Sequence, residues 1–305
     1  MSHRIAVIVN CASGSGHSAE WAKQLHGKFC RDGIDCRVTV VKDGSEMKAA
    51  IEAEVRDRPD TVVAAGGDGT VNAVASKLIG TEIRFGILPV GTLNHFAKDV
   101  GVPLDVDAAI ANIIDGHCIK ADVGQVNQEV FVNNSSIGLY PDIVSQRDAE
   151  QRLRKRGKWP AFCQAFVGAL FRYPFMVVRM NVDGQELEQC TPCLFVGNNE
   201  YALEGFDIGG RKRVDAGVLS LCIVQSEKRR ALLALAIRAL LGRLQQSRDL
   251  KTMLATEITV ETMRRKKRVA TDGQVNVMDV PLHYRIRPGA LNVIVPRPPS
   301  VAAKG

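Results

Sequence analysis

This sequence has no long apolar run that could cross a membrane. Its longest apolar helical stretch, Ala231 to Leu241, is interrupted by Arg238 and is much shorter than the roughly 20 residues that a bilayer span needs. It also has no leader-like start, because Met1 to Arg4 lead directly into the strand-like run Ile5 to Val9. We therefore expect no transmembrane segment and no secretion, and we predict a cytoplasmic protein.

Aromatic residues are scarce as well. They make up 5% of the 305 residues and no nucleic-acid recognition motif accompanies them, so we expect no nucleic-acid partner. Positive charge is in excess, with a formal net charge of +7, and such an excess attracts anions such as nucleotides, nucleic acids or acidic lipids without choosing between them. The charge gathers in three clusters, and each taken alone is better explained as a solvated helix end or hairpin turn: Arg152 to Lys158, Lys228 to Arg230 and Arg264 to Arg268.

Paired cysteine motifs are also missing. The eight cysteines are scattered through a large chain without a leader, which favours reduced thiols. Cys190 and Cys193 have redox-motif spacing, but they precede the strand-like run Leu194 to Val196, and no second pair completes a zinc site. We expect them to be core or edge cysteines.

The first 120 or so residues alternate β-rich runs with amphipathic helical patterns, which is typical of a parallel sheet with helices on its faces. We predict an amino-terminal three-layer α/β nucleotide-binding domain over residues 1–125. Its predicted strands are Ile5 to Val9, Cys36 to Val41, Thr61 to Ala65 and Phe85 to Leu88, and its clearest helices are Ala19 to Arg31 and Glu46 to Arg56.

From Ile119 onward, strand-like runs are broken by Gly, Asn and Asp, with turn pairs at Asp183-Gly184 and Asp272-Gly273. We predict an antiparallel β-sandwich domain over residues 126–289, with helical insertions near Trp159 to Phe171 and from Arg229 to Leu244. The final segment, 290–299, is compatible with a return to the first domain. The predicted strands are Gln128 to Asn133, Phe175 to Val182, Leu187 to Val196, Leu219 to Val224, Glu257 to Thr262, Lys267 to Thr271 and Ala290 to Val295.

The segment Gly66-Gly67-Asp68-Gly69-Thr70 lies between a predicted buried strand and a helical pattern. This arrangement points backbone N–H groups and a positive helix end at an anion, and the glycines allow the backbone to approach a phosphate closely. Thr70 is placed to cap the helix. A carboxylate beside a phosphate is repulsive unless a metal mediates, so Asp68 suggests Mg²⁺, whereas a purely structural glycine turn is the alternative.

Two further polar loops follow predicted strands of the same domain. Thr92 and Asn94 lie in the loop after Phe85 to Leu88, and Asn10 precedes the segment Ser13 to Gly16. Ligands of open α/β sheets bind at the carboxyl ends of the strands. We therefore predict that these loops and the glycine turn form one nucleotide site.

Several of these segments together resemble the diacylglycerol kinase catalytic-domain family, in its soluble bacterial lipid-kinase branch within the NAD kinase superfamily. The resemblance spans nearly the whole chain, and its most specific part is the block Gly91-Thr92-Leu93-Asn94-His95-Phe96-Ala97. The matching segments are Val9-Asn10, Gly66 to Asn72, Gly86 to Ala97, Asp272-Gly273 and Pro288 to Leu291.

The resemblance implies an ATP- and Mg²⁺-dependent kinase whose acceptor is the hydroxyl of a diacylglycerol-like or other lipid. It implies that ATP is held by Asn10, Thr39, Gly66 to Thr70, Thr92 and Asn94. It implies further that Asp68, Asp122 and Asp215 belong to the acidic magnesium network. Such an enzyme would work peripherally at the anionic inner membrane face, and a homodimer is compatible with the sequence.

Three positions depart from the family pattern. His95 and Ala216 stand where the family commonly has Asp, and Gln274 stands where it has the proton-accepting Glu. Gln274 cannot take a proton, so either Asp272 serves as the base or the transfer proceeds with a weak base at reduced rate.

Two other functions stay open. One is NAD kinase, with Asn198-Asn199-Glu200 as a nucleotide-contacting segment, and the other is a nucleotide- or lipid-binding regulator with a lapsed catalytic site.

Overall fold

The computed structural model describes residues 3–11, 19–29, 34–139, 141, 175–201, 210–211, 213–225 and 250–298. The chain divides into two compact units, one formed by residues 1–121 and 289–305 and the other by residues 122–288. The segment Ser13 to Gly16 and both predicted helical insertions lie outside the described residues. Two strands, β5 (His117–Val126) and β16 (Leu282–Val295), contribute residues to both units.

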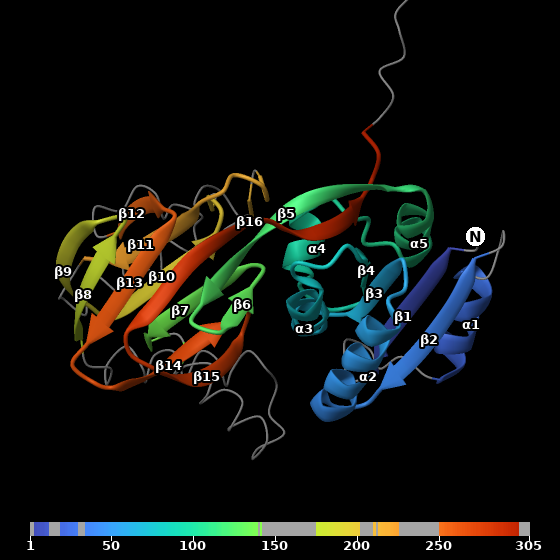
Figure 1. Ribbon diagram of the computed structural model, residues 1–305, viewed down its shortest axis with the longest axis horizontal. Coiled ribbons are helices and arrows are strands. Elements are labelled where there is room, and N and C mark those ends of the chain that lie inside the picture. The colour runs from blue at the N-terminus through green and yellow to red at the C-terminus, as the bar shows by residue number, and fades with distance from the viewer. Residues whose placement is uncertain are drawn as a thin grey trace, which may run out of the picture. The chain divides into compact units, whose positions relative to one another are not determined.

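The first unit is built on a parallel sheet in the order β2-β1-β3-β4, followed by the end of β16, which pairs with β4 at Val293 and Phe85 (Figure 1). All six residues of β3 are buried, which explains their continuous apolar run. The strands are β1 (Arg4–Asn10), β2 (Asp35–Val41), β3 (Thr61–Gly66) and β4 (Arg84–Pro89). The helices are α1 (Ala19–Phe29), α2 (Gly44–Asp57), α3 (Asp68–Leu78), α4 (His95–Asp99) and α5 (Val106–Asp115).

The second unit consists of antiparallel sheets. In one, β16 pairs with β13 and β5, and β8 and β9 continue from β13; the other has the order β12-β11-β10-β7-β14-β15. The strands are β6 (Glu129–Phe131), β7 (Asn134–Gly138), β8 (Met176–Val182), β9 (Gln185–Thr191), β10 (Cys193–Asn198), β11 (Leu219–Val224), β12 (Leu250–Ala255), β13 (Glu257–Thr262), β14 (Lys266–Thr271) and β15 (Gln274–Asp279).

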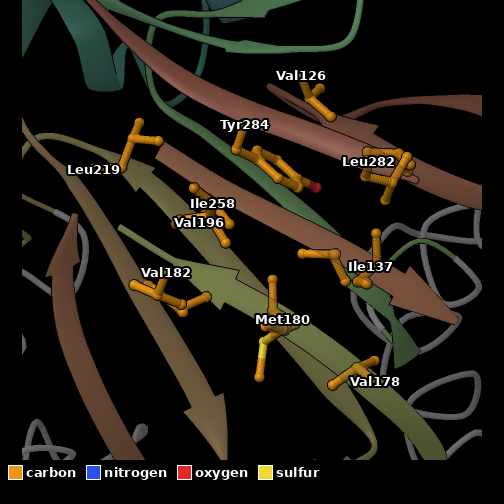
Figure 2. Close-up of a cluster of buried hydrophobic side chains, with 14 of the residues drawn as sticks. Val126, Ile137, Val178, Met180, Val182, Val196, Leu219, Ile258, Leu282 and Tyr284 are labelled. Atoms are coloured by element: carbon orange, nitrogen blue, oxygen red, sulfur yellow. The ribbon is translucent and has the colours of Figure 1, made fainter. Parts of the chain in front are cut away.

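The core of the second unit takes alternate residues from both sheets. Val178, Met180 and Val182 of β8 lie in one buried cluster with Val196 of β10 and Tyr284 of β16 (Figure 2). Alternation of buried and exposed residues along β8 is the pattern expected of a strand with one buried face. The prediction of an α/β domain followed by an antiparallel β domain is therefore confirmed.

The structure corrects two predicted strands. The run Leu187 to Val196 is not one strand, because it is interrupted at Pro192, which has no N–H to donate, and forms β9 and β10 instead. The final strand begins at Leu282, well before the predicted Ala290. Among the helices of the described residues, none combines the length and the apolar character that a membrane span requires.

Candidate active site

The glycine turn lies where the sequence predicts it, between β3 and α3. Gly67 is the N-cap of α3, and its carbonyl accepts N–H bonds from Thr70 at 2.9 Å and Val71 at 3.0 Å. The N–H groups at the start of a helix have no partner within the helix, and the helix dipole favours an anion there. The N–H groups of Asp68 and Gly69 therefore have no partner within the helix.

Thr70 does not cap the helix, contrary to the prediction. It is the third helical residue, and no side chain caps the N-terminus of α3. Its buried hydroxyl instead accepts a hydrogen bond at 2.9 Å from the Nδ2 of Asn10, at the end of β1. Asn10 and Thr70 are thus brought together by a bond that joins the end of β1 to the start of α3.

Two glycines allow close packing around the glycine turn. A Cβ on Gly91 would lie 2.3 Å from the Cα of Gly67, and a Cβ on Gly66 would lie 2.3 Å from the Oγ1 of Thr70. Real Cβ atoms do not approach other atoms this closely, so neither position accepts a side chain without movement of the backbone or of Thr70. Gly91 therefore allows the β3 and β4 loops to touch, and Gly66 leaves room for the Thr70 side chain.

Asn94 holds the β4 loop in shape. Its Nδ2 donates to the carbonyls of Pro89 and Gly91 at 3.1 and 3.0 Å, and its Oδ1 accepts the Gly91 N–H at 3.1 Å. Its backbone is left-handed, with φ of 53°, a conformation that Asn tolerates better than most residues. Asn94 therefore organises the loop that carries the exposed Thr92.

Asp68 connects the glycine turn to α4. Its Oδ1 accepts the N–H of Phe96 at 3.4 Å, in the first turn of a helix whose own N-cap, Asn94, makes no side-chain cap bond. The carboxylate therefore lies between the two predicted loops. Thr39 is engaged elsewhere, because its hydroxyl donates to the buried Glu54 of α2 at 3.2 Å.

The second unit holds the remaining predicted residues. Asp272 and Gly273 form the two-residue turn between β14 and β15, with φ of 47° and 82°, which confirms the predicted hairpin. Gln274 follows as the first residue of β15 and is exposed.

The Asp272 carboxylate is held by the loop between β6 and β7. It accepts the N–H groups of Val132, Asn133 and Asn134 at 2.8, 2.9 and 2.9 Å. Burial raises the pKa of Asp272 to about 6, against the lowering effect of these three bonds and of the Arg211 charge. Both carboxylate oxygens are therefore occupied by main-chain donors.

Arg211 donates hydrogen bonds to acceptor atoms of the same loop. It is 7% exposed, its Nη1 donates to the Val132 carbonyl at 2.6 Å, and its Nη2 donates to the Asn133 Oδ1 at 3.2 Å. The Tyr201 hydroxyl adds a bond of 2.7 Å to the Asn133 carbonyl. The sequence analysis missed Arg211 and Tyr201, because nothing in their local pattern reveals bonds to residues more than sixty positions away.

Asn198 and Asn199 are fully buried and serve the fold. Asn198 donates to the carbonyls of Asp122 and Val132 at 2.8 and 2.9 Å, and the Asn199 Oδ1 accepts the Ala216 N–H at 3.0 Å. A buried amide committed to main-chain groups is poorly placed to contact a nucleotide. This weighs against the NAD kinase interpretation.

Asp122 and Asp215 both have partners in the segment 213–217. The buried Asp122 carboxylate accepts the Gly217 N–H at 2.6 Å, whereas the exposed Asp215 forms an ion pair with Arg213 at 3.0 Å. The hydrogen bond from Arg213 holds the pKa of Asp215 below its ordinary value. Carboxylates are suitable Mg²⁺ ligands, but in the part of the chain that the structure describes no three His, Cys, Asp or Glu residues form a metal-binding group. Asp122 thus fits a magnesium site by donor type, while the position of the further family carboxylate is filled by Ala216.

Comparison with known proteins places these features in a family. Residues 4–126 match the diacylglycerol kinase catalytic domain, and residues 140–295 match the YegS C-terminal NAD kinase beta sandwich-like domain. A protein of Klebsiella pneumoniae described as "Probable lipid kinase YegS-like" is 36% identical over 44% of this chain and 46% of its own length. A diacylglycerol kinase of Staphylococcus carnosus is 25% identical over 74% of each chain.

Solved structures give the same result at the level of the fold. A candidate diacylglycerol kinase from Bacillus anthracis strain Sterne has a TM-score of 0.75 at 25% identity and covers 96% of this chain and 97% of its own. A yeast NADH kinase bound to NADH shares the fold, with a TM-score of 0.54 at 10% identity over 96% of this chain and 83% of its own. By its two matched domains, this chain belongs to the diacylglycerol kinase family of bacterial lipid kinases, in the branch with a YegS-type C-terminal domain.

Proposed function

We propose that this protein transfers the γ-phosphoryl group of ATP to the hydroxyl of a diacylglycerol-like lipid. The observation that carries the proposal is the turn at Gly67 and Asp68, where a buried strand ends, α3 begins without a side-chain cap, and the Gly91 loop packs against it. The free N–H groups of the turn would bind the phosphates of ATP. Phosphoryl transfer depends mainly on such positioning and on charge neutralisation.

Magnesium is expected to accompany ATP. Asp68, Asp122 and Asp215 are the proposed carboxylates of its network, and the ion would neutralise charge on the transferring phosphoryl group. Asp68 has a second task, since its bond to the Phe96 N–H fixes the β4 loop beside the glycine turn.

Removal of the acceptor proton is the weak step of this chemistry. Asp272 is enclosed by three N–H donors and Gln274 has no basic group, so neither matches the ordinary proton acceptor of the family. We propose that Asp272 positions the 132–134 loop and that transfer proceeds with a weak base. General-base catalysis typically contributes about 10²–10⁴-fold, so a slow enzyme is expected.

The test uses purified protein with Mg²⁺ and γ-labelled ATP, offered diacylglycerol, phosphatidylglycerol, a sphingoid base and NAD in separate reactions. Label is expected in a lipid, and Asp68→Asn is expected to lower the rate at least ~10²-fold. Asp35→Asn is the matched control, because Asp35 is exposed and is the first residue of β2, away from the carboxyl ends of the strands. Transfer to NAD, or equal rates in both variants, would contradict the proposal.

One observation favours a second function. Because both Asp272 oxygens are occupied and residue 274 is Gln, the chain could bind ATP without using it, as a regulator. Equilibrium binding of labelled ATP separates the two cases. ATP binding combined with no transfer to any of the four acceptors would favour the regulator.

A further inference from the structure

The basic segment Arg264 to Arg268 begins in the connection from β13 to β14 and continues into the first three residues of β14, in the second unit. It follows the end of β13 at Thr262 and runs into β14, which pairs with β15. Met263, in this connection, is 93% exposed. Exposed apolar side chains gain nothing from contact with water, and Met263 lies directly before five cationic residues.

Two hydrogen bonds hold the connection between β13 and β14. The Thr262 hydroxyl donates to the Arg264 carbonyl at 3.0 Å, and the Val280 N–H donates to the Arg265 carbonyl at 2.9 Å. Val269 and Met278, on the two strands of the hairpin, are anchored in the core of the second unit. The exposed side chains of the connection are therefore attached to strands that are anchored in the core.

Register places further side chains on the same outward face. Arg268 lies opposite Val277, and Lys266 lies opposite Asp279, so each pair shares one face of the hairpin. Val277 is 64% exposed and lies on β15, the edge strand of its sheet. We call the set Met263, Arg264, Arg265, Lys266, Arg268 and Val277 the hairpin surface.

The charges of Arg264, Arg265 and Lys266 are weakly compensated. Asp279 lies 3.8 Å from Lys266, but both side chains are largely exposed. No carboxylate in the described part of the chain pairs with Arg264 or Arg265, whose side chains are exposed. A surface that combines cations with exposed apolar side chains suits an anionic bilayer, which has charge at its surface and an apolar interior below it.

We propose that the hairpin surface docks the protein on anionic phospholipid membranes, with Met263 entering the bilayer and the arginines contacting lipid headgroups. The inference rests on the proposed function, because a kinase for a membrane-resident lipid must reach the bilayer. A nucleic acid would use the cations alone and leave Met263 and Val277 in water. The apolar residues therefore favour the membrane.

The experiment measures sedimentation with vesicles of phosphatidylglycerol and phosphatidylcholine, and with vesicles of phosphatidylcholine alone. Arg264→Glu combined with Arg265→Glu is expected to weaken binding to the anionic vesicles at least ten-fold, since each charge near such a surface contributes about a five-fold factor. Lys23→Glu combined with Lys48→Glu makes the same charge change at two exposed helical positions of the first unit. This control should change binding less than three-fold.

Met263→Ser tests insertion separately from charge. It is expected to weaken vesicle binding at least three-fold and to leave binding to heparin, a soluble polyanion, unchanged. An equal loss in the lysine control, an unchanged Met263→Ser variant, or tighter binding to duplex DNA than to anionic vesicles would overturn the proposal.

Two further readouts keep this proposal apart from the kinase proposal. Vesicle binding is measured without ATP, so an inactive protein can still support the docking surface. Kinase activity on a short-chain diacylglycerol dispersed in detergent should be the same in the Arg264→Glu, Arg265→Glu variant as in the wild type. A loss there would mean that the hairpin serves the reaction itself, which would contradict a docking role.

Discussion

Two Asp-Gly turns of this chain have the same backbone but opposite effects on their carboxylates. Asp183-Gly184 joins β8 to β9 with φ of 47° and 90°, and Asp272-Gly273 joins β14 to β15 with φ of 47° and 82°. Burial tends to raise the pKa of both, yet the pKa of Asp183 lies below its ordinary value, because the N–H groups of Glu257 and Thr256 and the Thr256 hydroxyl outweigh burial. For Asp272, burial dominates. The environment, and not the turn, therefore sets the chemistry of the carboxylate.

This contrast predicts a pH dependence of stability. The pKa of Asp272 is raised to about 6 in the folded protein, so its protonated form is favoured by folding. Its contribution to the free energy of unfolding is fully present below pH ~4, is lost as pH rises toward ~6, and is constant above that. Urea unfolding of wild type and Asp272→Asn should therefore differ in its pH profile over this window.

Asp183→Asn is the control for that measurement. Because the folded pKa of Asp183 is lowered, its stabilising contribution is present above pH ~4 and is lost as pH falls further. Profiles that change in the same direction for both variants would refute the assignment.

Gln274 offers a direct test of the missing base. Gln274→Glu should raise lipid phosphorylation at least about ten-fold, within the ~10²–10⁴-fold range of general-base catalysis. Gln185→Glu is the matched control, because Gln185 follows the other Asp-Gly turn and opens β9 as Gln274 opens β15. An unchanged or lower rate for Gln274→Glu would count against the role inferred for this position.

Two loops of the first unit depend on each other through their glycines. The β3–α3 turn and the β4 loop touch where Gly67 faces Gly91, while Asn94 braces one loop from within and Asp68 reaches across from the other. A site assembled from two loops loses its shape when either one moves.

Gly91→Ala should therefore weaken ATP binding at least ten-fold and lower the melting temperature. The new Cβ would lie 2.3 Å from the Gly67 Cα, and backbone atoms cannot move aside as a flexible side chain can. Gly27→Ala is the control, because this helical glycine has open space around its Cβ and alanine there should stabilise α1 by about 0.5–1 kcal/mol. Binding is read by isothermal titration and stability by thermal unfolding.

The elements near the site could be predicted because their patterns are local. The strand Thr61 to Gly66, the glycine turn after it and both Asp-Gly hairpins are encoded by neighbouring residues. The bonds of Asp272 and Arg211 to the 132–134 loop join positions some 80 to 140 residues apart, and no period or spacing in one sequence reports them. Thr70 shows the same limit, since its bond to Asn10 replaced the helix cap that its local position suggested.

The end of β16 completes the sheet of the first unit. Leu291 and Val293 of β16 are fully buried in the first unit, and the Asn292 Nδ2 donates to the Thr81 carbonyl at 3.0 Å. Ala290 accepts the Gly80 N–H at 3.0 Å. The first unit therefore lacks a strand until residues 289–298 are present.

A fragment experiment tests this dependence. Residues 3–121 alone should not unfold cooperatively, whereas the same segment joined to residues 289–298 should. A linker of a few residues suffices, because a Cβ on Gly289 would lie only 3.4 Å from the Cβ of Lys120. Calorimetry compares the two, with a fusion carrying Val293→Asp as the control that is expected to fail. Cooperative melting of residues 3–121 alone would contradict the inference.

Because β16 completes the first unit, that unit cannot finish folding until the second unit has been translated. After residue 121 has been made, residues 122–288 must be translated before the missing strand emerges, which at about 5–20 residues per second takes on the order of ten seconds. Throughout that time, the side of β4 that pairs with Val293 lacks its partner. We expect a nascent-chain chaperone to bind at this unpaired side of β4. A premature stop codon before residue 289 leaves both units incomplete.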